Sequence, residues 1–190
     1  AKQIAEALKY IHSKKILHRD IKPENVFISN SLIKLGDFGI SKELSTSTEF
    51  ASTAIGTPYY FSPEICHSFK YNHKSDIWCF GCLLFELMTL ERPFKADNIS
   101  QLIYKITSQE PCIEIDNNLY DDWLIEMTLR MLDKEPKNRP SSKEIVELIN
   151  KNSEEIAKEV ELKIELNIYV NDENERNKIN GVDKKEDTNK

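Results

Sequence analysis

The sequence has too little of several features to belong to some common classes of protein. Four cysteines in 190 residues are too few for a disulfide scaffold, so reduced thiols in the cytosol or nucleus are expected. A net charge of −6 lacks the positive excess of a nucleic-acid-binding domain. No apolar run could cross a membrane, since even the stretch from Trp78 to Met88 contains Glu86, and no signal peptide is expected. We therefore expect a soluble globular protein without nucleic-acid or membrane partners. Residue 1 is Ala1, inside an expected helix. Removal of an initiating methionine is one explanation, and a chain cut from a longer protein is the favoured one.

Two of the cysteines, Cys79 and Cys82, form a C-x-x-C pair, which is compatible with redox chemistry or with half of a zinc site. The pair lies inside an apolar helical stretch, and no second cysteine pair completes a metal site. Packing is the favoured interpretation, because free cysteine commonly behaves as a small buried hydrophobe. Redox or metal use stays the alternative.

The stretch with the clearest chemistry runs from His18 to Asn25 and reads HRDIKPEN. Asp20 can accept a proton from an attacking hydroxyl, Lys22 can neutralise a phosphate, and Asn25 can ligate magnesium. Phosphoryl transfer needs positioning and charge neutralisation more than covalent help from the protein, and these groups supply both. The alternative, a solvated polar turn, is disfavoured once the later motifs are counted.

Hydrophobic spacing predicts a mainly helical chain with one small hairpin. An amphipathic helix is expected over residues 1–13, and two short β-prone runs at 26–28 and 33–35 predict a hairpin. Further helices are expected at residues 75–90, 98–108, 121–133 and 141–150. The first of these is apolar over most of its surface and should be buried on several sides. The last opens with Ser141 and Glu144 at capping-box spacing.

The hairpin leads into a second motif, Gly36-Asp37-Phe38-Gly39. An aspartate between glycines can reach a metal that bridges the phosphates of a bound nucleotide. Residues 40–55 are rich in serine and threonine, show no periodicity and predict a flexible loop. The run GTPYY at residues 56–60 and the run SPE at residues 62–64 follow that loop.

The composition changes after Asn150. Residues 154–170 fit both a helical and a strand period, so the two remain alternatives. Residues 171–190 have almost nothing to bury and predict disorder. We therefore expect a domain at 1–150 and a charged, asparagine-rich, partly disordered tail at 151–190. The tail is either regulatory or partner-binding, or inert and solvated.

Taken together, these motifs resemble the large lobe of eukaryotic protein kinases over roughly residues 1–150. Lys22 and Thr57 are similar to the serine/threonine branch. Leu-Gly before Asp-Phe-Gly, the run GTPYY and the run KSDIW at residues 74–78 resemble the NIMA-related kinases most; Ser62 departs from the usual A-P-E. The resemblance implies an α+β, protein-kinase-like fold: a mainly helical C-terminal lobe with a small β-hairpin at the catalytic loop.

The resemblance also implies the catalytic roles. Asp20 would be the base, Lys22 the phosphate contact, and Asn25 and Asp37 the magnesium ligands. Thr57 would bond near Asp20 and Lys22. ATP and Mg²⁺ are the implied cofactors, and proteins are the implied substrates.

Other residues would position or regulate the site. Phe27 would lie beneath adenine, and Phe38 would pack near His18. Arg19 precedes Asp20, and in kinases with that pair a phosphate on the activation loop often pairs with the arginine. Thr53 matches the site phosphorylated in NIMA-related kinases. Competing sites in the same loop are Thr46, Ser47, Thr48 and Ser52.

The same resemblance implies two contacts that hold the lobe together. Glu64 would form a buried ion pair with Arg139, and Asp76 would bind the backbone of the catalytic loop. Everything that forms the upper lobe of a kinase is absent from the sequence: the glycine-rich loop, the strand lysine, the helix glutamate and the hinge. Two interpretations follow. The chain is part of a serine/threonine protein kinase that transfers the ATP γ-phosphoryl group to Ser/Thr hydroxyls, or it is a truncated, non-catalytic interaction module. Substrate, pathway and oligomeric state are not determined by the sequence.

Overall fold

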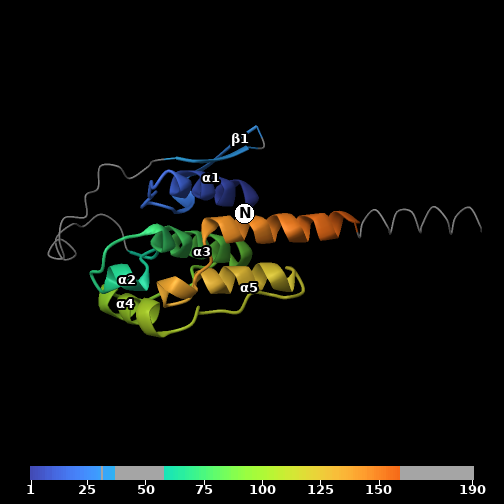
Figure 1. Cartoon of the computed structure of the whole chain (residues 1–190). Coiled ribbons are helices and arrows are strands. Elements are labelled where there is room, and N and C mark those ends of the chain that lie inside the picture. Colours follow the sequence, from blue (N-terminus) through green and yellow to red (C-terminus); the bar gives the residue numbers. More distant parts are fainter. Residues whose placement is uncertain (31, 37–57, 159–190) are drawn as a thin grey trace, which may run out of the picture. The chain divides into compact units, whose positions relative to one another are not determined.

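The computed structural model describes residues 1–30, 32–36 and 58–158 (Figure 1). The expectations for Asp37, Phe38, Thr53 and Thr57, for the loop at 40–55 and for residues 159–190 lie outside the described residues. The chain divides into two units, residues 1–148 and 149–190, and the hairpin and helices α1 to α5 all belong to the first.

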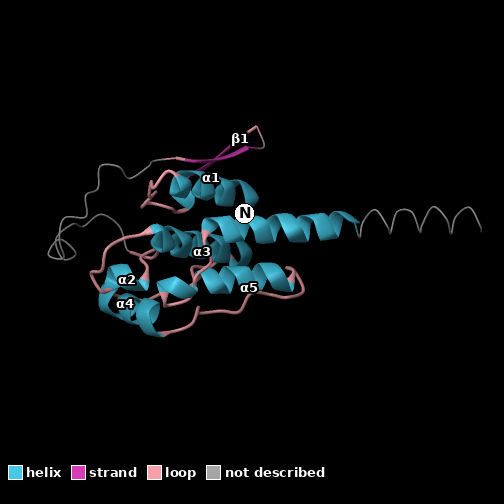
Figure 2. Cartoon of the chain, in the orientation of Figure 1, coloured by secondary structure: helices cyan, strands magenta, loops and turns pink. Residues whose placement is uncertain are grey.

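Helices dominate the described chain, and one antiparallel hairpin accompanies them, which gives the α+β fold expected (Figure 2). The elements follow in the order α1 (Lys2–Ser13), the 3₁₀ turn η1 (Pro23–Asn25), β1 (Val26–Ser29), β2 (Leu32–Leu35), α2 (Pro63–Cys66), α3 (His73–Thr89), α4 (Ile99–Ser108), α5 (Asp122–Met131) and the 3₁₀ turn η3 (Pro136–Asn138). A last helix covers residues 142–158.

The hairpin packs on α1. Helix α1 buries Ile4, Leu8 and Ile11, which share one face at helical spacing. Strands β1 and β2 pair from Val26↔Leu35 to Ser29↔Leu32. The side chain of Gln3 on α1 accepts a hydrogen bond from the backbone of β2, so the helix and the hairpin are fixed to each other immediately before and after the catalytic loop.

Helix α3 is the core of the first unit, and it is drawn between α1 and α5 in Figure 1. It is buried along most of its length, as its apolar sequence predicts. A Cβ at Gly81 would lie 2.8 Å from the Cβ of Met131, so only glycine lets α3 and α5 approach this closely. Asn72 begins the helix with a capping box, and Leu90 ends it in the left-handed conformation, at φ 58°.

The predicted helices are confirmed, and one of them is longer than expected. Ser141 and Glu144 form the predicted capping box through reciprocal bonds of 2.7 and 3.2 Å. The helix that they begin continues past Asn150 to at least residue 158. The short helix α2 and the two 3₁₀ turns were not predicted, because three or four residues are too few to show a period.

Both cysteines of the C-x-x-C pair lie buried on α3 as free thiols. Burial raises the pKa of Cys79 and of Cys82, which keeps both protonated, and Cys79 donates to the carbonyl of Tyr60 over 3.1 Å. These contacts support the packing interpretation. In the described ranges no group of three or more His, Cys, Asp or Glu side chains could hold a metal. The same ranges contain no helix of the length and apolarity that a membrane span requires.

Candidate active site

The side chains of the loop at residues 18–25, the candidate catalytic loop, converge on Asp20. Its Oδ2 lies 2.9 Å from Lys22 Nζ and accepts from Asn25 Nδ2, also over 2.9 Å. Asn25 Nδ2 additionally donates to the backbone oxygen of Asp20 over 2.7 Å. Pro23 is the first residue of the 3₁₀ turn that brings Asn25 next to Asp20, and the pyrrolidine ring of Pro23 fixes its backbone angle φ. The spacing of the three residues therefore produces one cluster.

The cluster contains one accessible carboxylate, that of Asp20, next to the buried side chain of Asn25. The side chains of Asp20 and Lys22 are 35% and 33% exposed, so both can meet a ligand, whereas Asn25 is buried. Because the Asn25 amide nitrogen is engaged by Asp20, its oxygen is the end left for a cation. Amide and carboxylate oxygens are the hard ligands that Mg²⁺ prefers, so the donor set fits that metal. Asp37, the second expected ligand, lies outside the described residues.

Asp76 of α3 holds the loop by its backbone. Its Oδ2 accepts from the amide of His18 and its Oδ1 from the amide of Arg19, each over 3.0 Å. Arg19 is in the left-handed region at φ 69°, which is costly for a side chain of this size. The two bonds fix that conformation, and the expected contact between Asp76 and the loop backbone is present in the structure.

Two further side chains complete the environment of Asp76. His12 Nε2 lies 2.8 Å from Oδ2, and the hydroxyl of Tyr71 donates to Oδ1 over 2.6 Å. Burial alone would raise the pKa of Asp76, but the hydrogen bonds from His12, Tyr71 and the loop amides outweigh it and lower the pKa. The carboxylate is therefore charged and fully bonded at neutral pH.

The His18 ring supports the backbone of Asp20. It is completely buried, and its Nδ1 accepts from the amide of Asp20 over 3.3 Å. This bond fixes the position of Asp20 from the interior of the lobe.

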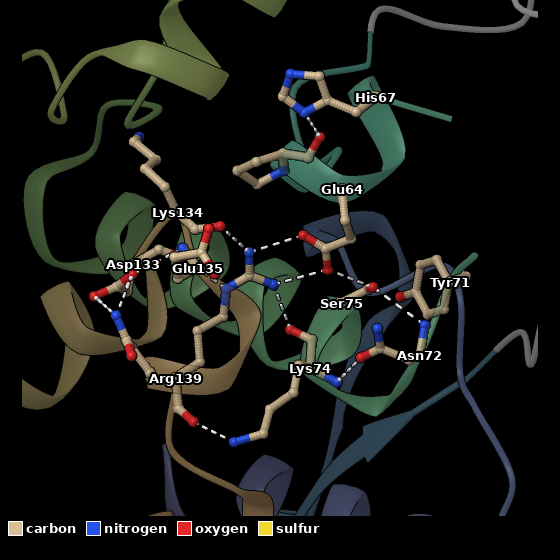
Figure 3. Close-up of polar contacts among 12 residues, drawn as sticks. Glu64, His67, Tyr71, Asn72, Lys74, Ser75, Asp133, Lys134, Glu135 and Arg139 are labelled. Atoms are coloured by element: carbon tan, nitrogen blue, oxygen red, sulfur yellow. Dashed lines mark hydrogen bonds and ion pairs between the residues drawn. The ribbon is translucent and has the colours of Figure 1, made fainter. Parts of the chain in front are cut away.

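The expected ion pair of Glu64 with Arg139 is present and fully buried (Figure 3). Both guanidinium Nη atoms donate to the carboxylate over 2.8 Å, and the hydroxyl of Ser75 adds a bond of 2.6 Å. Burial would raise the pKa of Glu64, but Arg139 and Ser75 lower it. The remaining guanidinium hydrogens go to the backbone oxygens of Lys74, Asp133 and Lys134. Such complete pairing is what a buried charge pair requires.

Phe27, expected beneath adenine, presents an exposed face. Its side chain is 51% exposed on β1, and a Cβ at Gly36 would lie 2.6 Å from its Cε2. A side chain at position 36 would therefore displace the ring from this position. Gly36 also donates its amide to the carbonyl of Asn25 over 2.9 Å, which joins the end of the hairpin to the catalytic loop.

Sequence reasoning missed His12, Tyr71 and Ser75. Each binds a buried carboxylate, but nothing in its neighbourhood indicates the partner; His12 and Asp76 are 64 residues apart. A histidine next to the apolar face of an amphipathic helix was the one available signal, and it is a weak one.

An anchored catalytic loop, a buried Glu–Arg pair and a helical lobe with a single hairpin define the large lobe of a protein kinase. The family model described as "Protein kinase domain" matches residues 1–149, and the chain belongs to this family. Its relatives place it in the Nek branch, which confirms the resemblance to the NIMA-related kinases. It is 46% identical to serine/threonine-protein kinase Nek9 of Mus musculus over 147 residues, which are 77% of this chain and 15% of the relative.

Two other relatives are of the same type. Serine/threonine-protein kinase Nek5 of Homo sapiens is 57% identical over 106 residues, or 55% of this chain and 15% of the relative. Probable serine/threonine-protein kinase nek3 of Dictyostelium discoideum is 49% identical over 152 residues, or 77% of this chain and 13% of the relative. The chain thus spans only a small part of the length of these curated relatives.

Proposed function

We propose that the protein is a serine/threonine protein kinase that transfers the γ-phosphoryl group of ATP to Ser/Thr hydroxyls of protein substrates. The observation that carries the proposal is the convergence of Lys22 and Asn25 on the accessible carboxylate of Asp20. Asp20 accepts the proton of the attacking hydroxyl at a carboxylate oxygen. During the transfer, the bond from phosphorus to the leaving oxygen breaks and a bond from phosphorus to the acceptor oxygen forms. Lys22 offsets the negative charge on the phosphoryl group throughout this step.

ATP and Mg²⁺ fit the residues present. Asn25 would hold Mg²⁺ through its amide oxygen together with Asp37, and Phe27 would lie beneath adenine with its exposed face. The metal, when bound, neutralises the phosphate oxygens. Thr57 would bond near Asp20 and Lys22 as part of the same site.

The activation loop completes the proposal. A phosphate on Thr53 would pair with Arg19, whose backbone is fixed by Asp76. Such a pair would order the loop beside the catalytic residues. The four free thiols of the chain agree with an intracellular location, in the cytosol or nucleus.

The nucleotide contacts of these residues come from one side only, so we propose that an upper lobe in the same polypeptide supplies the rest. Transition-state donors in other enzymes are worth about 2.7–4 kcal/mol each, and the upper lobe would contribute several. Residues 1–190 alone should therefore bind ATP weakly and transfer no phosphate, whereas the full-length protein should phosphorylate a generic acceptor protein.

The assay is transfer of radiolabelled γ-phosphate with magnesium, run on both polypeptides under the same conditions. Turnover by residues 1–190 with micromolar ATP affinity would show that the upper lobe is dispensable. No transfer by the full-length protein would favour the non-catalytic interaction module instead.

A further inference from the structure

A chain of hydrogen bonds links the start of the last helix to the loop at residues 18–25, and its first residue, Ser142, has no part in the proposed chemistry. Ser142 Oγ lies 3.2 Å from Nδ1 of His12, and Nε2 of the same ring lies 2.8 Å from Asp76 Oδ2. Asp76 in turn accepts from the backbone amides of His18 and Arg19. Ser142 and His12 are 130 residues apart in the sequence, so their contact joins the two ends of the kinase domain.

The two nitrogens of the His12 ring have complementary partners. The charged carboxylate of Asp76 can only accept, so His12 Nε2 has to carry a hydrogen. In the neutral ring Nδ1 is then an acceptor, and the hydroxyl of Ser142 donates to it. In the charged ring Nδ1 carries a hydrogen as well, and the same hydroxyl accepts from it. Ser142 therefore satisfies Nδ1 in both protonation states of His12.

Burial lets these two bonds select the orientation of the His12 ring. The His12 side chain is only 9% exposed, and both Asp76 and Ser142 are buried, so a lost partner is not simply replaced by bulk water. A half-turn of the imidazole about its bond to Cβ would put ring carbons where the two nitrogens now lie. Neither Asp76 nor Ser142 would then have its partner. With both bonds present the turned ring loses two hydrogen bonds, and without Ser142 it loses one.

Two neighbouring serines at the start of the last helix differ in what they bind. Ser141 accepts from the backbone amide of Glu144 as part of the capping box, so its hydroxyl stabilises the helix itself. Ser142 is the first residue of that helix, and its hydroxyl lies against His12. The capping box therefore fixes the place from which Ser142 reaches the ring.

We propose that Ser142 is a positioning residue for phosphoryl transfer: it holds the His12 ring so that Nε2 donates to Asp76, which fixes the loop backbone immediately before Asp20. The inference rests on the proposed kinase activity and names a further residue that supports it. Ser142 contacts no reacting group and acts through His12 and Asp76. When Ser142 is lost, the ring is oriented by Asp76 alone, and a ring that turns away leaves Asp76 without one of its donors. The amides of His18 and Arg19 are then held less firmly.

The test measures kcat and the KM for ATP of the full-length protein with a generic acceptor protein. Ser142→Ala removes one oxygen atom and leaves the packing otherwise unchanged. It should lower kcat about five-fold, the effect of one lost hydrogen bond of ordinary net strength, while the KM for ATP stays within about two-fold of the wild type. Ser142→Thr keeps the hydroxyl, and its kcat should stay within about two-fold of the wild type. Hydrogen exchange at the amides of His18 and Arg19, followed by mass spectrometry on the same protein, should be faster in Ser142→Ala.

Ser141→Ala is the matched control, because it removes the adjacent hydroxyl, which caps the helix. It should lower the stability of the protein but leave kcat and the exchange of the two loop amides unchanged. In a His12→Ala background, Ser142→Ala should have no further effect on kcat, because Ser142 acts through the ring. An unchanged kcat in Ser142→Ala, or an equal loss in Ser141→Ala, would overturn the inference. So would an undiminished effect of Ser142→Ala in the His12→Ala background.

The exchange measurement needs no activity, so it separates this inference from the proposed function. Unchanged exchange at both loop amides in Ser142→Ala would overturn the inference whether or not the protein transfers phosphate. Faster exchange in a protein that transfers no phosphate would overturn the kinase proposal and would still support the role of Ser142 in holding the loop.

Discussion

The substitution Asp76→Asn tests how the loop at residues 18–25 is held, because it replaces one of the two acceptor oxygens of Asp76 by an NH₂ group. The carboxylate accepts four hydrogen bonds: Oδ1 from Arg19 and Tyr71, and Oδ2 from His18 and His12. In Asp76→Asn one oxygen remains, so two of the four donors face an NH₂ group whichever way the amide turns. Either orientation leaves one backbone amide of the loop without an acceptor.

The expected cost follows from the lost bonds. A hydrogen bond to a charged group contributes about 1.5–3 kcal/mol, and an unsatisfied buried donor costs a similar amount. Tyr71 can rotate its hydroxyl and His12 can change its tautomer, so each can adapt to an amide nitrogen, whereas a backbone amide cannot. We therefore expect Asp76→Asn to lower the free energy of unfolding by about 3 kcal/mol, a large fraction of the 5–15 kcal/mol of a typical domain.

The assay is urea denaturation of the 190-residue chain, followed by circular dichroism at pH 7, with Tyr71→Phe as the matched control. The control removes one neutral donor to the same carboxylate and should cost about 1 kcal/mol. In the full-length protein Asp76→Asn should also lower kcat, because Arg19 is no longer held in its left-handed conformation. A loss of stability no larger than that of Tyr71→Phe would refute the reasoning, since the loop amides would then not depend on the charge of Asp76.

Two further predictions concern Glu64 and Thr53. The folded pKa of Glu64 lies below its ordinary value of 4.5, so its contribution to stability is present above that pH and is lost as pH falls through the lowered folded pKa. The unfolding free energy should therefore fall less steeply with falling pH in Glu64→Gln than in the wild type. The variant should be less stable at neutral pH, because Arg139 stays buried without its partner. Urea titrations between about pH 5 and pH 3 measure the slope for each protein, and equal slopes would contradict the lowered pKa of Glu64. Thr53→Ala should lower the activity of the full-length protein and Thr53→Asp should recover part of it; an unmodified Thr53 in mass spectra of active enzyme would rule out this site.

Structural elements and contacts formed by residues close together in the sequence could be predicted from it. Helix α3 follows from its unbroken apolar surface, and the helix at 142–158 begins where Ser141 and Glu144 indicated. The cluster of Asp20, Lys22 and Asn25 follows from fixed offsets in a short loop stiffened by proline. The extension of the helix at 142–158 past Asn150 could not be predicted, because residues 154–170 fit two periods.

Contacts between distant segments could not be derived from local pattern. The Glu64–Arg139 pair joins residues 75 apart, and only the family resemblance indicated it. The partners of Glu86, which are the hydroxyl of Tyr60 and the guanidinium of Arg92, gave no sequence signal, because a charged residue within an apolar helix is compatible with many neighbours. The pairing emerges only when the end of α3 meets the segment before α2.

The central claim, that Asp20 takes the proton of the acceptor hydroxyl, is tested most directly by Asp20→Asn in the full-length protein. Positioned general bases contribute about 10²- to 10⁴-fold, so kcat should fall by that factor. The affinity for ATP should stay nearly unchanged, because Asp20 acts on the hydroxyl and not on the nucleotide. Glu6→Gln, which alters an exposed carboxyl on α1, should leave both quantities unchanged. Near-normal turnover in Asp20→Asn would contradict the account.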